Sequence, residues 1–143
     1  MPTADHSGNE LRELLHLVFP ANADGVSSAA DAVSDTLNQL AVPEQKRLEI
    51  GLAVQEALVN AVVHGCANDP TKNVTCLMRS DGDGRIFILV RDPGPGFDPD
   101  RVPEPKADEN LHRDHGRGVY LIRQLMDEVQ FEQRGREIRM WKY

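Results

Sequence analysis

The sequence predicts an α+β domain of two layers, in which helices pack on one face of a mixed, mostly antiparallel sheet. Three observations support this prediction: the order of strand-like and helix-like segments, an Asp-Gly turn between two apolar runs, and one run that is apolar on both faces. The order is strand, two helices, two strands, a long loop, one helix and two strands. With 40% hydrophobic and 27% charged residues, residues 1–143 have the composition of one ordinary globular domain.

The first two elements lie before residue 42. Residues 10–19 alternate in a way that fits strand or helix, and we favour a strand that ends at Pro20. Residues 22–41 are typical of a helix, because apolar side chains recur at three- and four-residue steps. These side chains are Ala30, Val33, Leu37 and Leu40.

The strongest helix signal in the chain lies between Pro43 and Gly65. Proline is well accepted in the first turn of a helix, and glycine is a natural stop. We expect this helix to bury one apolar stripe, with alanines beside it. The stripe consists of Leu48, Leu52, Val59 and Val63.

Two strand-like runs, residues 74–80 and 85–91, are joined by the turn sequence Asp-Gly-Asp-Gly and therefore predict a hairpin. The second run is apolar on both faces, which is typical of a central strand. Residues 118–129 then predict a helix. Residues 129–135 and 137–143 predict a closing pair of strands.

The bulk composition excludes several classes of function. A net charge of −7 and a pI near 5.1 argue against direct nucleic-acid binding and against an anionic membrane surface. No segment resembles a signal peptide or a membrane helix, and no cysteine pattern indicates zinc. We expect a cytoplasmic protein in which Cys66 and Cys76 are reduced and partly buried.

A polar ridge is predicted on the long helix, where Glu56, Asn60 and His64 follow one another at steps of four residues. One interpretation is the solvated side of an amphipathic helix. The other is an edge for metal binding and proton transfer, in which Asn60 offers an oxygen to Mg²⁺ and Glu56 acts as a base. For His64 alone, we expect contact with the last carbonyls of the helix.

A second candidate site is the loop Asp-Pro-Gly-Pro-Gly, which begins with Asp92 directly after the central strand. A carboxylate at that position can accept a hydrogen bond from an exocyclic amine such as that of adenine. Gly94 and Gly96 would let the loop backbone lie against a flat ring. The alternative is a plain turn, because Asp-Pro-Gly is common turn chemistry.

A third candidate site is the pair Gly116 and Gly118, which stand immediately before an apolar-periodic helix. Exposed N–H groups at a helix N-terminus attract phosphate, and glycine permits close approach. A flexible loop that ends in a helix start would look the same. The common phosphate loop and the serine nucleophile elbow are both missing from the sequence.

The order of these three motifs resembles the ATP-binding domain of gyrase, histidine kinases and MutL. Within that superfamily, the segments "EALVNAVVHG", "DPGPGFD" and "HGRGVYLIRQLMDEV" are similar to the small anti-sigma-factor serine/threonine kinases of bacteria, the RsbW and SpoIIAB type. The resemblance covers about residues 44–143. It implies the histidine-kinase-like ATPase fold, with ATP and Mg²⁺ as cofactors.

The resemblance also implies roles for individual residues. Glu56 matches the family's general base, and Asn60 matches the ligand that ties Mg²⁺ to the nucleotide phosphates. Asp92 matches the carboxylate that recognises the adenine amine. Gly94 and Gly96 match the loop beneath the ring.

The remaining matched positions concern the phosphates. Gly116 and Gly118 match the glycines whose backbone approaches them, and residues from about 99 to 115 match the ATP lid. Family members often place a basic residue just before the glycines, and Arg113 and Arg117 both qualify. The lid sequence itself matches no fixed family pattern.

At the level of function, the resemblance implies an ATP-dependent protein serine/threonine kinase. Such a protein phosphorylates an anti-anti-sigma (STAS-type) partner and sequesters a sigma factor, and it can form a homodimer. The alternative is a non-catalytic switch of the same fold that binds a partner protein according to its nucleotide state.

Overall fold

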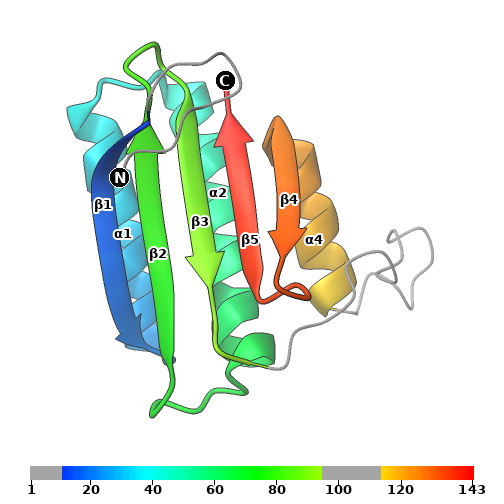
Figure 1. Ribbon diagram of the computed structural model, residues 1–143. Coiled ribbons are helices and arrows are strands. Elements are labelled where there is room, and N and C mark those ends of the chain that lie inside the picture. Colours follow the sequence, from blue (N-terminus) through cyan, green and yellow to red (C-terminus); the bar gives the residue numbers. More distant parts are fainter. Residues whose placement is uncertain (1–10, 95–113) are drawn as a thin grey trace.

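The computed structural model describes residues 11–94 and 114–143. The described strands and helices follow one another in the predicted order, and the strands form one five-stranded sheet. Figure 1 shows the helices packed on one face of this sheet. A short π-helical segment, η1, continues the second helix. The elements are β1 (Arg12–Pro20), α1 (Ala23–Gln39), α2 (Glu44–Asn60), η1 (Ala61–Gly65), β2 (Asn73–Ser80), β3 (Ile86–Arg91), α4 (Asp114–Leu125), β4 (Glu128–Glu132) and β5 (Glu137–Lys142).

The sheet has the strand order β1-β2-β3-β5-β4, and every pair of described strands is antiparallel. The predicted α+β fold class is therefore confirmed. β3 lies at the centre between β2 and β5, as its apolar faces indicated, and five of its six residues are buried. The hairpin that joins β2 to β3 is confirmed as well.

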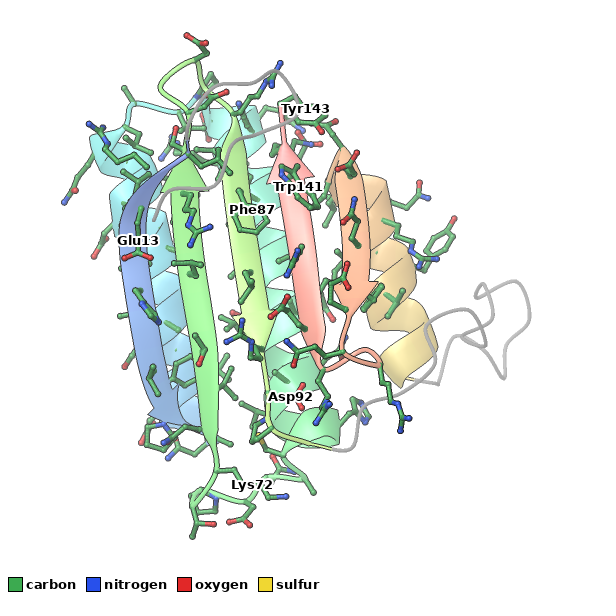
Figure 2. All side chains as sticks on the ribbon, in the orientation of Figure 1. Glu13, Lys72, Phe87, Asp92, Trp141 and Tyr143 are labelled. Atoms are coloured by element: carbon green, nitrogen blue, oxygen red, sulfur yellow. The ribbon has the colours of Figure 1, made fainter. Side chains whose placement is uncertain are left out.

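Alternation along β3 divides its side chains between two clusters. Ile86, Ile88 and Val90 belong to the main core under the helices. Phe87 belongs to a smaller cluster on the opposite face, where its ring centroid lies 5.0 Å from that of Trp141 (Figure 2). β3 is thus packed on both of its faces.

The predicted apolar stripe on α2 is wrong for Leu48 and Leu52, whereas Val59 is partly buried against the core. Leu48 and Leu52 are 63% and 45% exposed, whereas the buried side chains of the helix are Ile50, Ala53, Val54, Ala57 and Leu58. The physical reason is the position of α2, which packs against α1 on one side and α4 on the other (Figure 1). Small alanines permit this close approach, and the buried face therefore combines alanines with Ile50, Val54 and Leu58.

The long helix ends at Gly65, as predicted, but its last turn is not α-helical. Residues 61–65 form the π-helical segment η1, and the N–H of Cys66 donates to the carbonyl of Ala61 at 2.9 Å. Single π turns occur frequently at functional sites. The chain then continues through Ala67 and Asn68, which both have left-handed φ.

The start of α4 corrects another prediction. We expected Gly116 and Gly118 to precede this helix, but α4 begins at Asp114, so both glycines lie inside its first turns. Glycine disfavours a helix by about 1 kcal/mol relative to alanine. Packing of α4 against α2 outweighs that preference.

Two further expectations concern cysteines and membranes. Cys66 and Cys76 are buried and free, and burial raises the pKa of both thiols, that of Cys76 to about 12. Within residues 11–94 and 114–143, none of the helices has the length and apolar character needed to cross a lipid bilayer.

Candidate functional site

A pocket opens between the helix layer and the ends of the central strands. It holds about 490 Å³ of space, including its open mouth. Its apolar wall is made by Ala57, Ala61, Val90, Val119, Ile122, Phe131 and Ile138. Its polar groups are Asn60, His64, Asp92 and Arg136. A mostly apolar cleft with a few convergent polar groups is typical of a site for a small organic ligand.

Asp92 stands at the end of the pocket, directly after β3 (Figure 2). Its Oδ1 accepts a hydrogen bond from the N–H of Gly94 at 2.8 Å. Burial raises the pKa of the carboxyl, and the Gly94 hydrogen bond with the charges of Arg136 and Lys72 limits that rise. Among the described residues no donor reaches Oδ2, so that oxygen can accept a hydrogen bond from a ligand.

Two glycines hold the Asp92 carboxylate from either side. A Cβ added to Gly65 would overlap that carboxylate, and a Cβ added to Gly94 would overlap the carbonyl oxygen of Gly65. Gly94 therefore packs on Gly65 and donates to Asp92. The expected contact of Gly94 with a ligand ring remains a prediction.

Gly65 is a site residue that the sequence analysis missed. Its sequence signal was only that of a helix stop, and the closeness of Asp92 depends on how the helix end meets the end of β3. Both residues line the pocket.

Glu56 and Asn60 lie one turn apart on α2, and both are half-buried. Gly118 of α4 packs against them: a Cβ at this glycine would lie 2.8 Å from Asn60 Nδ2 and 3.3 Å from Glu56 Oε2. The two side chains therefore face α4, unlike the exposed Leu48 and Leu52. The structure thus brings Glu56, Asn60 and Gly118 together.

His64 also lines the pocket, from η1. The other predicted site residues are placed only in part. Gly116 and Arg117 lie in the first turn of α4, whereas Gly96 and Arg113 lie outside the described residues. Of the predicted lid, residues 99–113 also lie outside them.

The β4–β5 hairpin supplies pocket residues that the sequence analysis did not identify: Phe131, Gly135 and Arg136. The guanidinium of Arg123 lies 5.6 Å from the centre of the Phe131 ring. The sequence indicated only two strands here. Their relation to Asp92 follows from the pairing of β5 with β3, which is a long-range contact.

The site also agrees with a magnesium ion held mainly by a phosphate ligand. Mg²⁺ usually takes one or two oxygens from the protein and the rest from phosphates and water. Asn60 provides one amide oxygen at the pocket wall. Across the described parts of the chain, no group of three or more His, Cys, Asp or Glu side chains is arranged to hold a metal.

Comparison with known sequences identifies one family and two related groups of proteins. The histidine kinase-like ATPase domain family matches residues 19–142. The anti-sigma F factor of Geobacillus stearothermophilus is 34% identical over 123 residues, which cover 83% of this chain and 82% of that protein. The serine-protein kinase RsbW of Staphylococcus aureus is 28% identical over 138 residues, which cover 92% of this chain and 87% of that protein.

Solved structures agree on the fold. The RsbU and RsbW domains of a Mycobacterium tuberculosis protein match with a TM-score of 0.63 and 18% identity, over 90% of this chain and 31% of that chain. The histidine kinase domain of a blue-light-activated kinase from Erythrobacter litoralis matches with a TM-score of 0.51 and 20% identity. The match covers 85% of this chain and 59% of that chain. The chain therefore belongs to the histidine kinase-like ATPase domain family, in its anti-sigma factor branch.

Proposed function

We propose that the protein is an ATP-dependent serine/threonine kinase that phosphorylates an anti-anti-sigma protein and also sequesters a sigma factor. One observation carries the proposal: a single pocket joins the carboxylate of Asp92 to Asn60, with Glu56 one helical turn away. The names of the relatives, an anti-sigma F factor and a serine-protein kinase, support the same class of protein.

Asp92 is the residue that we propose to recognise the adenine base. Its Oδ2 accepts a hydrogen bond from the adenine amine, while the apolar wall contacts the faces of the ring. A hydrogen bond to an ionised carboxylate is stronger than one between neutral groups. Asp92 therefore contributes both affinity and a preference for a base that carries an amine.

Asn60 and Gly118 are the proposed phosphate-side residues. Asn60 would offer its amide oxygen to Mg²⁺, which when bound offsets negative charge on the phosphates. Gly118 leaves room for the Asn60 and Glu56 side chains at the start of α4. The backbone of Gly116, in the first turn of that helix, is the proposed neighbour of the phosphates.

Glu56 is the proposed general base. It orients the hydroxyl of a serine or threonine on the partner protein and takes its proton as the oxygen attacks the γ-phosphorus. The bond from that phosphorus to the bridging oxygen breaks, and ADP leaves. A change of nucleotide state then shifts the protein between its partners.

Three broader expectations from the sequence remain proposals. Residues 1–143 act as one domain, the protein works in the cytoplasm where sigma factors act, and it forms a homodimer. Size measurements in solution, with and without ATP, test the last of these.

The kinase proposal is tested by incubating the protein with labelled ATP, Mg²⁺ and candidate anti-anti-sigma proteins from the same genome. We expect the wild type to label one partner and Glu56→Ala to lose this transfer by about 100-fold or more, with ATP binding retained. Gln55→Ala, a change at the exposed neighbouring position, is the matched control. If wild type and Glu56→Ala both bind ATP and neither labels any partner, the protein is a non-catalytic, nucleotide-dependent binding switch.

A further inference from the structure

The pairing of β3 with β5 places a second charged side chain beside Asp92. Val90 and Ile138 are register partners, and both line the pocket. One rung further toward the pocket end, the N–H of Asp92 donates to the carbonyl of Arg136 at 2.9 Å. Side chains two residues apart on a strand share a face, so Asp92 and Arg136 face the pocket together. Directly opposed Cβ atoms in such a pair are about 4.5–5.5 Å apart.

The two side chains influence each other without forming a described hydrogen bond. Burial raises the pKa of Asp92, and the positive charge of Arg136 is one of the influences that limit the rise. Arg136 uses its Nε to donate to the carbonyl of Gln133 at 3.0 Å. Within the described part of the chain, its terminal N–H groups make no further hydrogen bond. They can therefore donate to a ligand beside Asp92.

The hairpin turn restricts where the guanidinium can lie. Gln133 and Arg134 both have left-handed φ, at 53° and 61°, a conformation that non-glycine residues adopt rarely. The hydrogen bond from Arg136 to Gln133 joins the side chain to this turn. Arg136 is thus held at the pocket instead of extending freely into solvent.

We propose that Arg136 is a specificity-determining residue that reads the nucleobase together with Asp92. The pair presents an acceptor beside a donor, and adenine presents the complement: an amine beside a ring nitrogen that accepts a hydrogen bond. Hypoxanthine has a carbonyl in place of the amine and carries a proton on N1. Asp92 therefore selects against it, and Arg136 does so as well where its partner is N1. This inference rests on the proposed ATP binding and adds a second reader to it.

The test is a set of dissociation constants for ATP, 1-deaza-ATP, 7-deaza-ATP and inosine triphosphate, measured by calorimetry. We expect Arg136→Ala to weaken ATP about 10-fold, as for loss of one charge-assisted hydrogen bond. The wild type should lose a similar factor with one of the two deaza analogues. Arg136→Ala should show no further loss of affinity with that analogue. If the analogue is 1-deaza-ATP, the ratio of the dissociation constants for inosine triphosphate and ATP should also be smaller in Arg136→Ala than in the wild type.

Two further variants separate base reading from structure. Arg134→Ala changes the same turn at an exposed residue that does not line the pocket, and should bind all four nucleotides like the wild type. Arg136→Gln retains an N–H donor and should recover part of the ATP affinity. If Arg136→Ala melts at a lower temperature than the wild type without ligand, the nucleotide affinities of Arg136→Gln are compared with those of the wild type instead.

The outcomes distinguish this inference from the proposed function. If the wild type binds ATP and Arg136→Ala binds it equally well, Arg136 does not read the base. The inference is also overturned if Arg136→Ala weakens ATP and both deaza analogues by the same factor. If the wild type binds none of these nucleotides, the proposed function fails first.

Discussion

Asp92 combines a half-buried setting with a proposed function that requires its charge. Burial raises the pKa of this carboxyl above its ordinary value of 3.8. The proposed hydrogen bond from the adenine amine requires the ionised form, because a carboxylate accepts from two oxygens and a carboxylic acid keeps one proton. Ligand binding and folding therefore favour opposite protonation states of one residue.

This opposition predicts a pH dependence. As the pH falls through the raised pKa, Asp92 becomes protonated and ATP affinity declines, beginning above pH 3.8. Folding favours the neutral carboxyl, since a raised pKa contributes stability at low pH that is lost as pH rises. The decline in affinity is thus not a result of unfolding through this group. Calorimetric titrations of the wild type across the acidic range measure it.

Asp92→Asn is the control for that measurement. We expect it to weaken ATP by about 1.5–3 kcal/mol at neutral pH, as for a hydrogen bond to a charged group. Its melting temperature should be maintained, because a neutral amide replaces a half-buried charge. The pH dependence that remains in this variant belongs to the nucleotide itself. Unchanged affinity for ATP would remove Asp92 from the site.

At the scale of elements, the close contact between α2 and α4 depends on one glycine. A Cβ at Gly118 would lie 2.8 Å from Asn60 Nδ2, closer than side chains normally approach. The amide group would have to turn away from its present position. The packing of the two helices therefore limits how the Asn60 amide can be oriented in the pocket.

We predict that Gly118→Ala lowers phosphate transfer and ATP affinity although alanine favours the helix by about 1 kcal/mol. Gly51→Ala on α2 is the matched control, because no atom lies within 4 Å of the added Cβ. It should raise the free energy of unfolding by about 0.5–1 kcal/mol and leave ATP binding unchanged. Denaturant titrations and calorimetry on both variants make the comparison. Equal behaviour of the two would show that contact with Asn60 does not matter.

The elements themselves were predictable where local signals decide them. β3 was identified from its two apolar faces, and its hairpin from Asp-Gly. The buried face of α2 was not, because alanines between two packed helices give a weak hydrophobic pattern. The π-helical turn at residues 61–65 also left no sequence signal, since it depends on how the chain leaves the helix.

At the scale of the whole molecule, the pocket joins both layers of the fold. Its lining comes from α2, η1, β3, α4, β4 and the beginning of β5. A ligand that contacts all of them binds the folded protein and not the unfolded chain. Binding should therefore stabilise the domain as a unit.

We predict that ATP with Mg²⁺, at 100 times its dissociation constant, stabilises the protein by about 2.7 kcal/mol. For a domain of this size the melting temperature should rise by on the order of 10 °C. In Asn60→Ala the rise should no longer depend on Mg²⁺. Thermal melts with ATP, with and without the metal, measure this. An Asn60→Ala protein that still responds to Mg²⁺ would place the ion elsewhere.

The site was predictable where its residues are near one another in sequence or stand beside a motif. Glu56 and Asn60 share one helix, and Asp92 was marked by the strand that precedes it. Arg136 and Phe131 carried no such mark, because only the strand order brings the last hairpin to the end of β3. The sequence predicted Gly65 as a helix stop, but it did not predict the contact of Gly65 with Asp92.

The contact between Gly65 and Asp92 has a consequence for inheritance. Every single-nucleotide change of a glycine codon that alters the amino acid introduces a residue with a Cβ, and that atom would overlap the Asp92 carboxylate. No single-nucleotide change that replaces Gly65 therefore leaves the Asp92 carboxylate in its present position. In a lineage that replaces Gly65, the Asp92 carboxylate has to move, and the proposed hydrogen bond to the base moves or is lost with it.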